Sequence, residues 1–334
     1  MNATINLEKK HFPVLLDEII SIISPLYGGT FIDCTFGQGN YSKKILENIQ
    51  NKIIAIDRDK EVFSFAEKLK NKVGKRFIFK NLKFSQINKI KINEEKLRGI
   101  VFDLGYSSIQ INNPNKGLSF RNNCKLNMKM GLNNLSADEV VNQFNESSMI
   151  KIFKFFGDEK KAKQIAKKII IERKKKNLET QDLVKIIESV KKYKKSKIHN
   201  ATKVFQSLRI FVNEEISELI NGLINAFNLL PVGGMIVVVT FNSLEDKIVK
   251  FFFKHYSEIK NSSRYIPEKI DKFKCFKLHK KKPITATLHE LNLNPSSRSA
   301  KLRYATKISN NCNFKDFIEK FAHLKKIEEL KFER

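Results

Sequence analysis

A glycine turn between a buried strand and a helix limits the folds open to this chain more than any other feature. Residues 31–36, FIDCTF, form a short apolar run that predicts a buried strand. Gly37 and Gly39 follow directly, and glycines so placed let the backbone come close to a ligand. Residues 41–49 then predict a helix, so the segment favours an α/β sheet with a nucleotide-like ligand over the turn.

Further apolar runs repeat this alternation along the chain. The strands predicted after the first are residues 52–57, 76–81, 99–105 and 235–241, with closing antiparallel strands at 273–278 and 301–306. Residues 59–69, entered at Asp59, predict a helix between two of these strands. This rhythm indicates parallel pairing with right-handed crossovers. The expected fold class is therefore α/β, with a Rossmann-like and mostly parallel sheet.

The alternation breaks after Gly105. Residues 108–134 are rich in Asn, Gly and Ser and predict a long loop, which a lysine-rich helical region follows. Residues 201–230 predict one long helix, and Ser243 with Asp246 three residues later predicts a capped helix start. We therefore expect residues 1–108 and 206–310 to form two parts of one α/β domain, with a helical insertion at 109–205 and a helical tail at 311–334.

The composition narrows the class of partner. A formal net charge of +28 over 334 residues favours a polyanion as partner, and nucleic acid is the commonest one, although an AT-rich genome also inflates lysine content.

The four cysteines form no CxxC pair, so neither a zinc site nor a disulfide framework is expected, which fits a reducing cytosol. No run approaches the roughly 18 apolar residues of a membrane span, so we expect a cytoplasmic protein.

The ligand of the glycine turn stays open on these residues alone. A dinucleotide fingerprint needs a third small residue, and Ser42 stands there. Asp57 ends the next strand about 20 residues on, where a carboxylate bonds ribose hydroxyls in both NAD and S-adenosylmethionine (SAM) enzymes. Asp103 lies at the carboxyl edge of a later strand, where open α/β sheets bind ligands, and Gln110 follows on the loop.

A series of segments along the chain helps to decide which ligand the glycine turn binds. They are, in order, HFPVLLDE, DCTFGQGNYS, AIDRD, FDLGYSSIQ, GLSF, ATKVFQSLRIFVNEE, FNSLEDKIVK, KKPI and NPSSRSAKLR. Together they resemble the RsmH (MraW) family of small-subunit ribosomal RNA cytosine-N4 methyltransferases, over about residues 11–306. The resemblance implies a class I SAM-dependent methyltransferase fold with a helical substrate-recognition insertion. It implies SAM as cofactor and, as target, a cytidine in the decoding centre of 16S rRNA, in an assembled or nearly assembled small ribosomal subunit.

The resemblance also implies positions for the cofactor site. With Gly37, the residues that match the family's SAM contacts are Gly39, Asn40, Tyr41, Asp57, Phe84, Asp103 and Gln110. Four residues depart from the family pattern: Asn40 replaces a glycine, Tyr41 a histidine, Asn127 an aspartate and Asn242 a histidine. We interpret Asn127 and Asn242 as positioning residues, since a family acid or base at either place would be lost here.

The chemistry asked of the site adds further candidates. The lone pair of a cytosine N4 amine is delocalised, so the protein must align the amine with the methyl group and supply acceptors aimed at N4. We expect Asp103, with the Leu104 backbone carbonyl, to do this. The expected RNA-contacting residues are Gln206, Arg209 and Asn213 on one helical stripe, and Arg298, Lys301 and Arg303 on phosphates. Each of these residues also fits an ordinary surface, and His11 fits either loop packing or the substrate cleft.

Two other functions remain compatible with the sequence. An NAD-dependent oxidoreductase is disfavoured by Ser42 and by the lack of a Tyr-x-x-x-Lys or catalytic histidine arrangement. A non-catalytic rRNA-binding or ribosome-assembly factor on a methyltransferase scaffold is kept open by Asn127 and Asn242. A homodimer is compatible with the sequence, and so is naked rRNA as the substrate.

Overall fold

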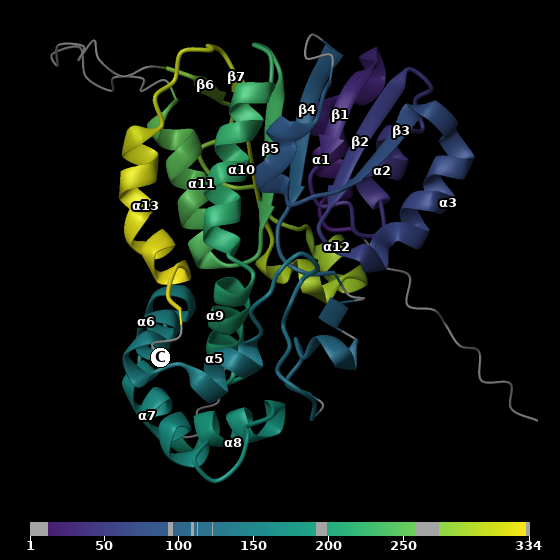
Figure 1. Cartoon of the computed structure of the whole chain (residues 1–334). Coiled ribbons are helices and arrows are strands. Elements are labelled where there is room, and N and C mark those ends of the chain that lie inside the picture. Colours follow the sequence, from purple (N-terminus) through teal and green to yellow (C-terminus); the bar gives the residue numbers. More distant parts are fainter. Residues whose placement is uncertain are drawn as a thin grey trace, which may run out of the picture.

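A seven-stranded sheet in the order β3-β2-β1-β4-β5-β7-β6 forms the frame of the molecule (Figure 1). The structure is a computed structural model and describes residues 13–92, 96–107, 110–111, 113–121, 123–191, 199–257 and 274–331. The strands are β1 Gly29–Asp33, β2 Asn51–Asp57, β3 Phe77–Asn81, β4 Leu97–Asp103, β5 Met235–Thr240, β6 Phe276–Leu278 and β7 Lys301–Lys307. Strands β1 to β5 pair in parallel, while β7 runs antiparallel to both β5 and β6.

Every predicted strand is confirmed to within a few residues. Residue 273, the first residue of the predicted strand 273–278, lies outside the described part of the chain. Helices α1 Leu16–Ile23, α2 Asn40–Ile45, α3 Phe63–Val73, α10 Glu215–Leu229 and α11 Ser243–His255 cover the sheet, α13 Lys315–Glu328 packs on α10 and α11, and α12 Leu288–Leu293 precedes β7. Between β4 and β5 the described residues also form α5 Ala137–Gln143, α6 Glu146–Gly157, α7 Ala162–Glu172, α8 Thr180–Val190 and α9 Thr202–Val212.

Alternating strand residues supply two separate cores, one on each face of the sheet. Phe31 of β1 packs with helices α1 to α3, whereas its neighbour Ile32 joins the core on the opposite face. The second core is larger and includes Leu219 and Leu223 of α10 and Phe252 of α11. Each such side chain contributes roughly 1.5–3 kcal/mol on burial. Both faces of the sheet are therefore covered, and the ends of the strands are left for binding.

Helices α5 to α8 lie below the sheet in Figure 1, with α9 leading back towards it. A single long helix over residues 201–230 was expected, and this prediction is wrong. The chain breaks between α9 and α10 because Glu214 adopts a left-handed conformation with φ of 52°. Asn213, at the end of α9, instead donates to the Met128 carbonyl oxygen and accepts from the Met130 amide. The division of the chain at residues 108, 205 and 310 stays a prediction.

The start of α11 also differs from the expected pairing of Ser243 with Asp246. The capping box is made one residue earlier by Asn242 and Glu245, each accepting from the other's backbone amide. Asp246 is free of that role and accepts from Arg303 Nε at 2.7 Å.

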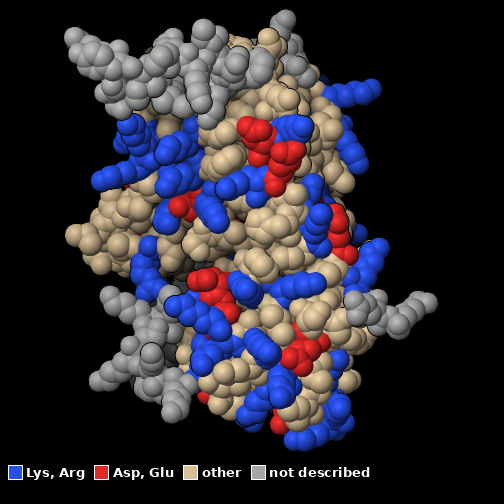
Figure 2. Space-filling view, turned by 90° about the vertical axis from the view of Figure 1, so that its left-hand side faces the viewer, with Lys and Arg blue, Asp and Glu red and all other residues tan. Residues whose placement is uncertain are grey.

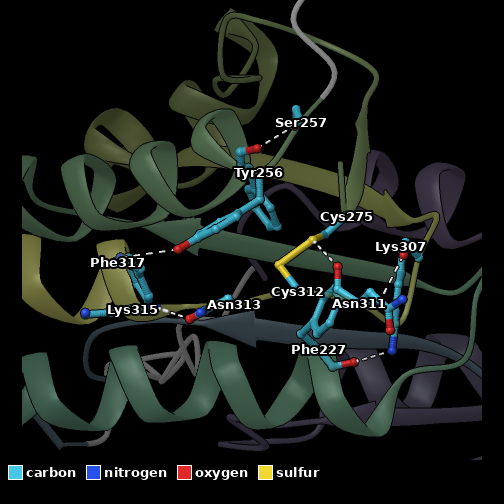
Figure 3. Close-up of a disulfide and its surroundings, with 12 residues drawn as sticks. Phe227, Tyr256, Ser257, Cys275, Lys307, Asn311, Cys312, Asn313, Lys315 and Phe317 are labelled. Carbon is cyan, nitrogen blue, oxygen red and sulfur yellow. Dashed lines mark hydrogen bonds between the residues drawn. A yellow bond between two sulfur atoms is a disulfide. The ribbon is translucent and has the colours of Figure 1, made fainter. Parts of the chain in front are cut away.

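One disulfide corrects the expectation drawn from cysteine spacing. Cys275, just before β6, is bonded to Cys312, which lies 37 residues on and before α13 (Figure 3). The fold brings their Cα atoms to 6.0 Å, which the sequence separation alone does not reveal. Beside them the Tyr256 hydroxyl accepts from the Phe317 amide, so the disulfide ties the segment before α13 to the start of β6, and the hydrogen bond ties α13 to the end of α11. Cys34 is buried outside this disulfide, and the Cys124 sulfur lies 3.4 Å from the Thr180 hydroxyl oxygen.

Candidate active site

Three aspartates stand at the carboxyl ends of three adjacent strands. Asp57 ends β2, Asp33 ends β1 and Asp103 ends β4, and these strands are neighbours in the sheet. This edge is where open α/β sheets bind ligands. Asp57 and Asp103 were predicted from the sequence, whereas Asp33 was missed. Its position directly before the glycine turn, like that of the other two at strand ends, was the available signal.

The glycine turn is tied to the end of β2. The Gly37 amide donates to Asp57 Oδ2 at 2.8 Å, and the Asp59 amide donates to Asp57 Oδ1 at 2.8 Å. Burial raises the pKa of Asp57 to about 6, against these two hydrogen bonds that lower it. Each oxygen keeps a lone pair, so the carboxylate still has room for ribose hydroxyls.

The two glycines face different surroundings. Gly39 has φ of 74°, and a Cβ there would lie 2.5 Å from the Phe36 ring. Gly37 has φ of 53°, and the nearest atom to a Cβ there is the Thr35 carbonyl oxygen, 3.9 Å away. The space over Gly37 is therefore open for a ligand, and Asn40 begins α2 immediately after the turn. This cradle, with Asp57 beside it, fits an adenosyl cofactor.

Asp33 accepts hydrogen bonds from residues on both sides of the glycine turn. Its Oδ2 accepts from the Ser42 hydroxyl at 2.7 Å, and its Oδ1 accepts from the Thr35 amide at 3.3 Å. Burial raises the pKa of Asp33 to about 6 despite the Ser42 hydrogen bond. Ser42, which occupies the third position of the glycine fingerprint, thus has a buried structural partner.

Asp103 has one engaged and one unengaged carboxylate oxygen. The Tyr41 hydroxyl lies 3.2 Å from Asp103 Oδ2 and 2.5 Å from the Val14 carbonyl oxygen. Tyr41 has a single proton to share between these two acceptors, and its hydrogen bond to Asp103 acts to lower the pKa of that carboxyl. Burial, and then the charges of Asp33 and Glu245, raise the pKa of Asp103 to about 7. Asp103 Oδ1 is buried and has no hydrogen-bond partner within the described structure.

Gln110 reaches the site through Asp59. Its Nε2 donates to Asp59 Oδ2 at 2.7 Å, and Lys116 Nζ donates to the same oxygen at 2.7 Å. Burial opposes ionisation, but the hydrogen bonds from Lys116 and Gln110 outweigh it and lower the pKa of Asp59. These contacts hold the loop after β4 against the end of β2. Phe84, which follows β3, packs edge-on against Phe102 of β4, with 5.5 Å between the ring centroids.

The predicted RNA stripe is not a shared exposed surface. Arg209 is 8% exposed and makes a bidentate pair with Glu215 at 2.8 Å for each bond. Its guanidinium lies 5.0 Å from the centroid of the Tyr106 ring. Although burial acts to lower it, the charges of Glu215 and Glu245 raise the pKa of Arg209. Arg209 therefore stands near the end of β4 as part of an ion cluster.

Most of the other predicted RNA contacts have hydrogen-bond partners within the protein. Asn213 is fully buried among backbone groups, and Gln206 Nε2 donates to the Phe156 carbonyl oxygen at 3.3 Å. Arg303 pairs with Asp246, which also accepts from Lys301 at 3.2 Å. Arg298 is exposed on the short helical turn Pro295–Ser299. His11 lies outside the described residues.

Asn127 and Asn242, which were interpreted from the sequence as positioning residues, both bond backbone groups. Asn127 donates to the Asn115 carbonyl oxygen at 3.1 Å, within the loop after β4. Asn242 Oδ1 accepts from the amides of Leu244 and Glu245 at the start of α11. In the part of the chain that the structure describes, no three His, Cys, Asp or Glu side chains gather to hold a metal, and no helix is long and apolar enough to cross a membrane.

The strand order with an antiparallel β7, the glycine cradle and the strand-end acids define a class I SAM-dependent methyltransferase. The chain belongs to the MraW methylase family, whose model matches residues 8–308. It is 42% identical over 308 residues to ribosomal RNA small subunit methyltransferase H of Orientia tsutsugamushi (strain Boryong), covering 90% of this chain and 98% of that protein. The protein of the same name from Rickettsia massiliae is 40% identical over 304 residues, covering 90% and 99%.

Among solved structures, a putative rRNA-methylase from Clostridium thermocellum is similar with a TM-score of 0.41 and 12% identity, covering 90% of this chain and 99% of that one. The family assignment rests on the sequence matches. SAM is the cofactor of this class of enzyme, and the open face of Gly37 with the Asp57 carboxylate suits its ribose and methionine parts.

Proposed function

We propose that this protein transfers a methyl group from SAM to the N4 amine of a cytidine in the decoding centre of 16S rRNA, the position conventionally called C1402. The observation that carries the proposal is the unpartnered, buried Oδ1 of Asp103 beside the glycine cradle. An acceptor without a partner at the reacting edge of the sheet suits an amine that must lose a proton.

The cofactor contacts follow from the positions of the strand ends. Asp57 would hold the ribose hydroxyls, the Gly37–Gly39 turn would pass under the methionine part, and Gln110 would keep the loop after β4 closed over both. When bound, SAM supplies a methyl group already activated by its sulfonium, so the protein has to align the reactants.

Asp103 then acts on the amine of the base. N4 forms the new bond to the methyl carbon as the carbon–sulfur bond breaks, with the bonding electron pair remaining on sulfur. Positive charge that develops on N4 is stabilised by Asp103 Oδ1, which takes the departing N4 proton. A pKa of about 7 lets this carboxyl accept the proton near neutral pH and release it afterwards.

A basic face on the helices below the sheet supports an RNA substrate. Exposed lysines on α6 and α7 with no acidic partner within the described structure include Lys151, Lys154, Lys163 and Lys167. Figure 2 shows Lys and Arg spread over this side of the molecule, with fewer Asp and Glu among them. These lysines, with exposed Arg298, would neutralise phosphates and position the RNA without reading its bases. An rRNA substrate within a small ribosomal subunit would place the protein in the cytoplasm.

Incubation of the purified protein with SAM and undermethylated small subunits tests the proposal. Nucleosides from the recovered rRNA are separated and weighed by mass spectrometry, and naked rRNA is treated in parallel. We expect N4-methylcytidine at one decoding-centre site, with Asp103→Ala as the inactive control. Methyl groups on carbon-5 or on a ribose would redirect the assignment, and salt-sensitive binding of subunits without transfer would favour an assembly factor.

A further inference from the structure

The ends of β4 and β5 present one buried acceptor and one buried donor, neither of which has a partner within the described structure. The acceptor is Asp103 Oδ1 and the donor is Asn242 Nδ2. We propose that these two atoms together read the edge of the target base, Asn242 donating to ring atom N3 and Asp103 accepting from N4, so that the site takes cytosine and rejects uracil. This inference rests on the proposed function and adds a specificity-determining residue to it.

The orientation of the Asn242 amide is fixed by the helix that it begins. Its Oδ1 accepts from the Leu244 amide at 3.0 Å and from the Glu245 amide at 2.9 Å. A flipped amide would place its NH2 group against two backbone donors, so the nitrogen must be on the other side. Nδ2 is therefore a donor that no group of α11 uses.

The free oxygen of Asp103 is fixed in a similar way. Oδ2 faces the Tyr41 hydroxyl, and the backbone amide of Asp103 donates to Thr35 Oγ1 at 2.7 Å. The side chain is thus held on one side, and Oδ1 is left as the acceptor. Leaving a buried polar group without a hydrogen bond costs free energy, so two such groups at the ends of two neighbouring strands call for a ligand.

Strand register places both residues at the same end of neighbouring strands. Asp103 pairs with Val239 across β4 and β5, and the Leu104 amide donates to the Val239 carbonyl oxygen at 3.0 Å. Asn242 follows three residues after Val239. A Cβ on Gly105 would lie 3.5 Å from the Phe241 ring, so the segments that follow β4 and β5 stay adjacent beyond the sheet. The charge of Glu245, the capping partner of Asn242, also acts on Asp103.

An acceptor beside a donor complements the edge of cytosine. Cytosine offers the N4 amine as a donor next to N3 as an acceptor, whereas uracil offers O4 as an acceptor next to an N3–H donor. Uracil would set O4 against the Asp103 oxygen and N3–H against the Asn242 NH2 group. A site built on hydrogen bonds discriminates strongly against an analogue that leaves its groups unpaired. Adenine shows the same donor and acceptor order, so the inference concerns cytosine against uracil alone.

Three substitutions separate base reading from helix capping. Asn242→Ser keeps an oxygen that caps α11 but removes the amide donor. Asn242→His restores a ring N–H donor and is the residue usual in the family. Asn242→Ala removes both the cap and the donor, so comparison of its thermal midpoint with that of Asn242→Ser measures the cap alone.

Binding of cytidine and uridine monophosphates to the protein saturated with S-adenosylhomocysteine, followed by ligand-observed NMR, tests the inference without methyl transfer. We expect the unchanged protein to prefer the cytidine nucleotide by about 10-fold or more, Asn242→Ser to bring the two within about 3-fold, and Asn242→His to recover most of the preference. A thermal midpoint of Asn242→Ser close to that of the unchanged protein accompanies this result.

Two outcomes overturn the inference: an unchanged protein that shows no preference or no signal for either nucleotide, and Asn242→Ser with the original preference. Failure of the proposed function looks different, because subunits would then gain no N4-methylcytidine even if the nucleotide preference and its loss in Asn242→Ser were found.

Discussion

Glu328 caps the first turn of α10 through Ser217, whose amide donates to Glu328 Oε2 at 2.8 Å and whose hydroxyl donates to the same oxygen. The other oxygen accepts from the Ile216 amide at 2.8 Å. Glu328 lies on α13, beyond residue 308 where the match to the family ends. Because α10 begins at Glu215, which holds Arg209, the tail steadies the ion cluster beside the site.

Glu328→Ala is expected to lower the free energy of unfolding by about 1–3 kcal/mol, because two amides at the start of α10 lose their acceptor. Glu328→Gln is expected to lose less, since an amide oxygen still accepts. Urea unfolding measures the change. Glu329→Ala removes the exposed neighbouring acid and serves as the matched control. A loss for Glu328→Ala no larger than the control's would contradict the cap.

Arg209→Ala is expected to destabilise the protein by about 3–5 kcal/mol, because it leaves the Glu215 and Glu245 carboxylates without their shared cation. Arg209→Lys keeps the charge but loses the bidentate geometry, so its stability is expected to lie between those of the unchanged protein and Arg209→Ala. Thermal or urea unfolding gives the stability.

The same variants decide whether Arg209 contacts RNA. If the ion cluster is its whole role, the slope of log K against log salt for RNA binding stays unchanged in Arg209→Ala, as it does in the charge-conserving Arg209→Lys. A contact with one phosphate would instead add about one unit of slope that Arg209→Ala removes.

The strands and the acids at their ends were open to prediction because both depend on local order in the chain. An apolar run followed by Asp57 or Asp103 determines where the side chain lies once the runs pair in parallel. Arg209 and Asn213 show the limit. Their helical spacing resembles a polar surface stripe, but their partners are Glu245 and the loop at Met128, which only the fold brings near.

The contacts of the cysteine pair and of Asn242 likewise could not be predicted from the sequence. Nothing in a separation of 37 residues indicates that Cys275 and Cys312 meet, since the strand β7 and the turn to α13 lie between them. Asn242 appeared as a departure from a family pattern. Its oxygen caps α11 and its nitrogen is buried without a partner within the described structure, and that burial depends on the fold and not on local sequence.

The pKa of Asp103 predicts opposite effects of pH on activity and stability. The rate of methyl transfer is expected to rise through about pH 7, since only the ionised carboxylate can accept the N4 proton. Stability is expected to fall over the range from about pH 4 to about pH 7, because a raised pKa means that the folded state holds the proton more tightly than the unfolded state.

Asp103→Asn tests both effects, because it cannot ionise. Its thermal midpoint is expected to match that of the unchanged protein near pH 4 and to exceed it by roughly 2–6 °C at pH 8, while transfer falls at every pH. Asp33 and Asp57 retain their own raised pKa values and keep part of the pH dependence. Equal midpoints at pH 8 would show that Asp103 ionises without penalty in the fold.

The lysines of α7 predict a salt-dependent affinity for RNA. Lys163 and Lys167 lie four residues apart on one exposed face, so the double change to Gln removes two neighbouring charges. We expect weaker binding to small-subunit rRNA and a slope of log K against log salt that is smaller by about 1.4–1.8, from 0.7–0.9 per phosphate contact. Filter binding at several salt concentrations measures both.

A matched control separates this local effect from the loss of net charge. Lys68 and Lys72 have the same spacing on α3, which lies at the far end of the molecule from α7 (Figure 1). Their change to Gln lowers the net charge by the same amount but is expected to leave the slope within about 0.3 units of the unchanged protein. Equal losses of slope for the two pairs would mean that RNA responds to the overall charge of +28, and that α7 makes no specific phosphate contact.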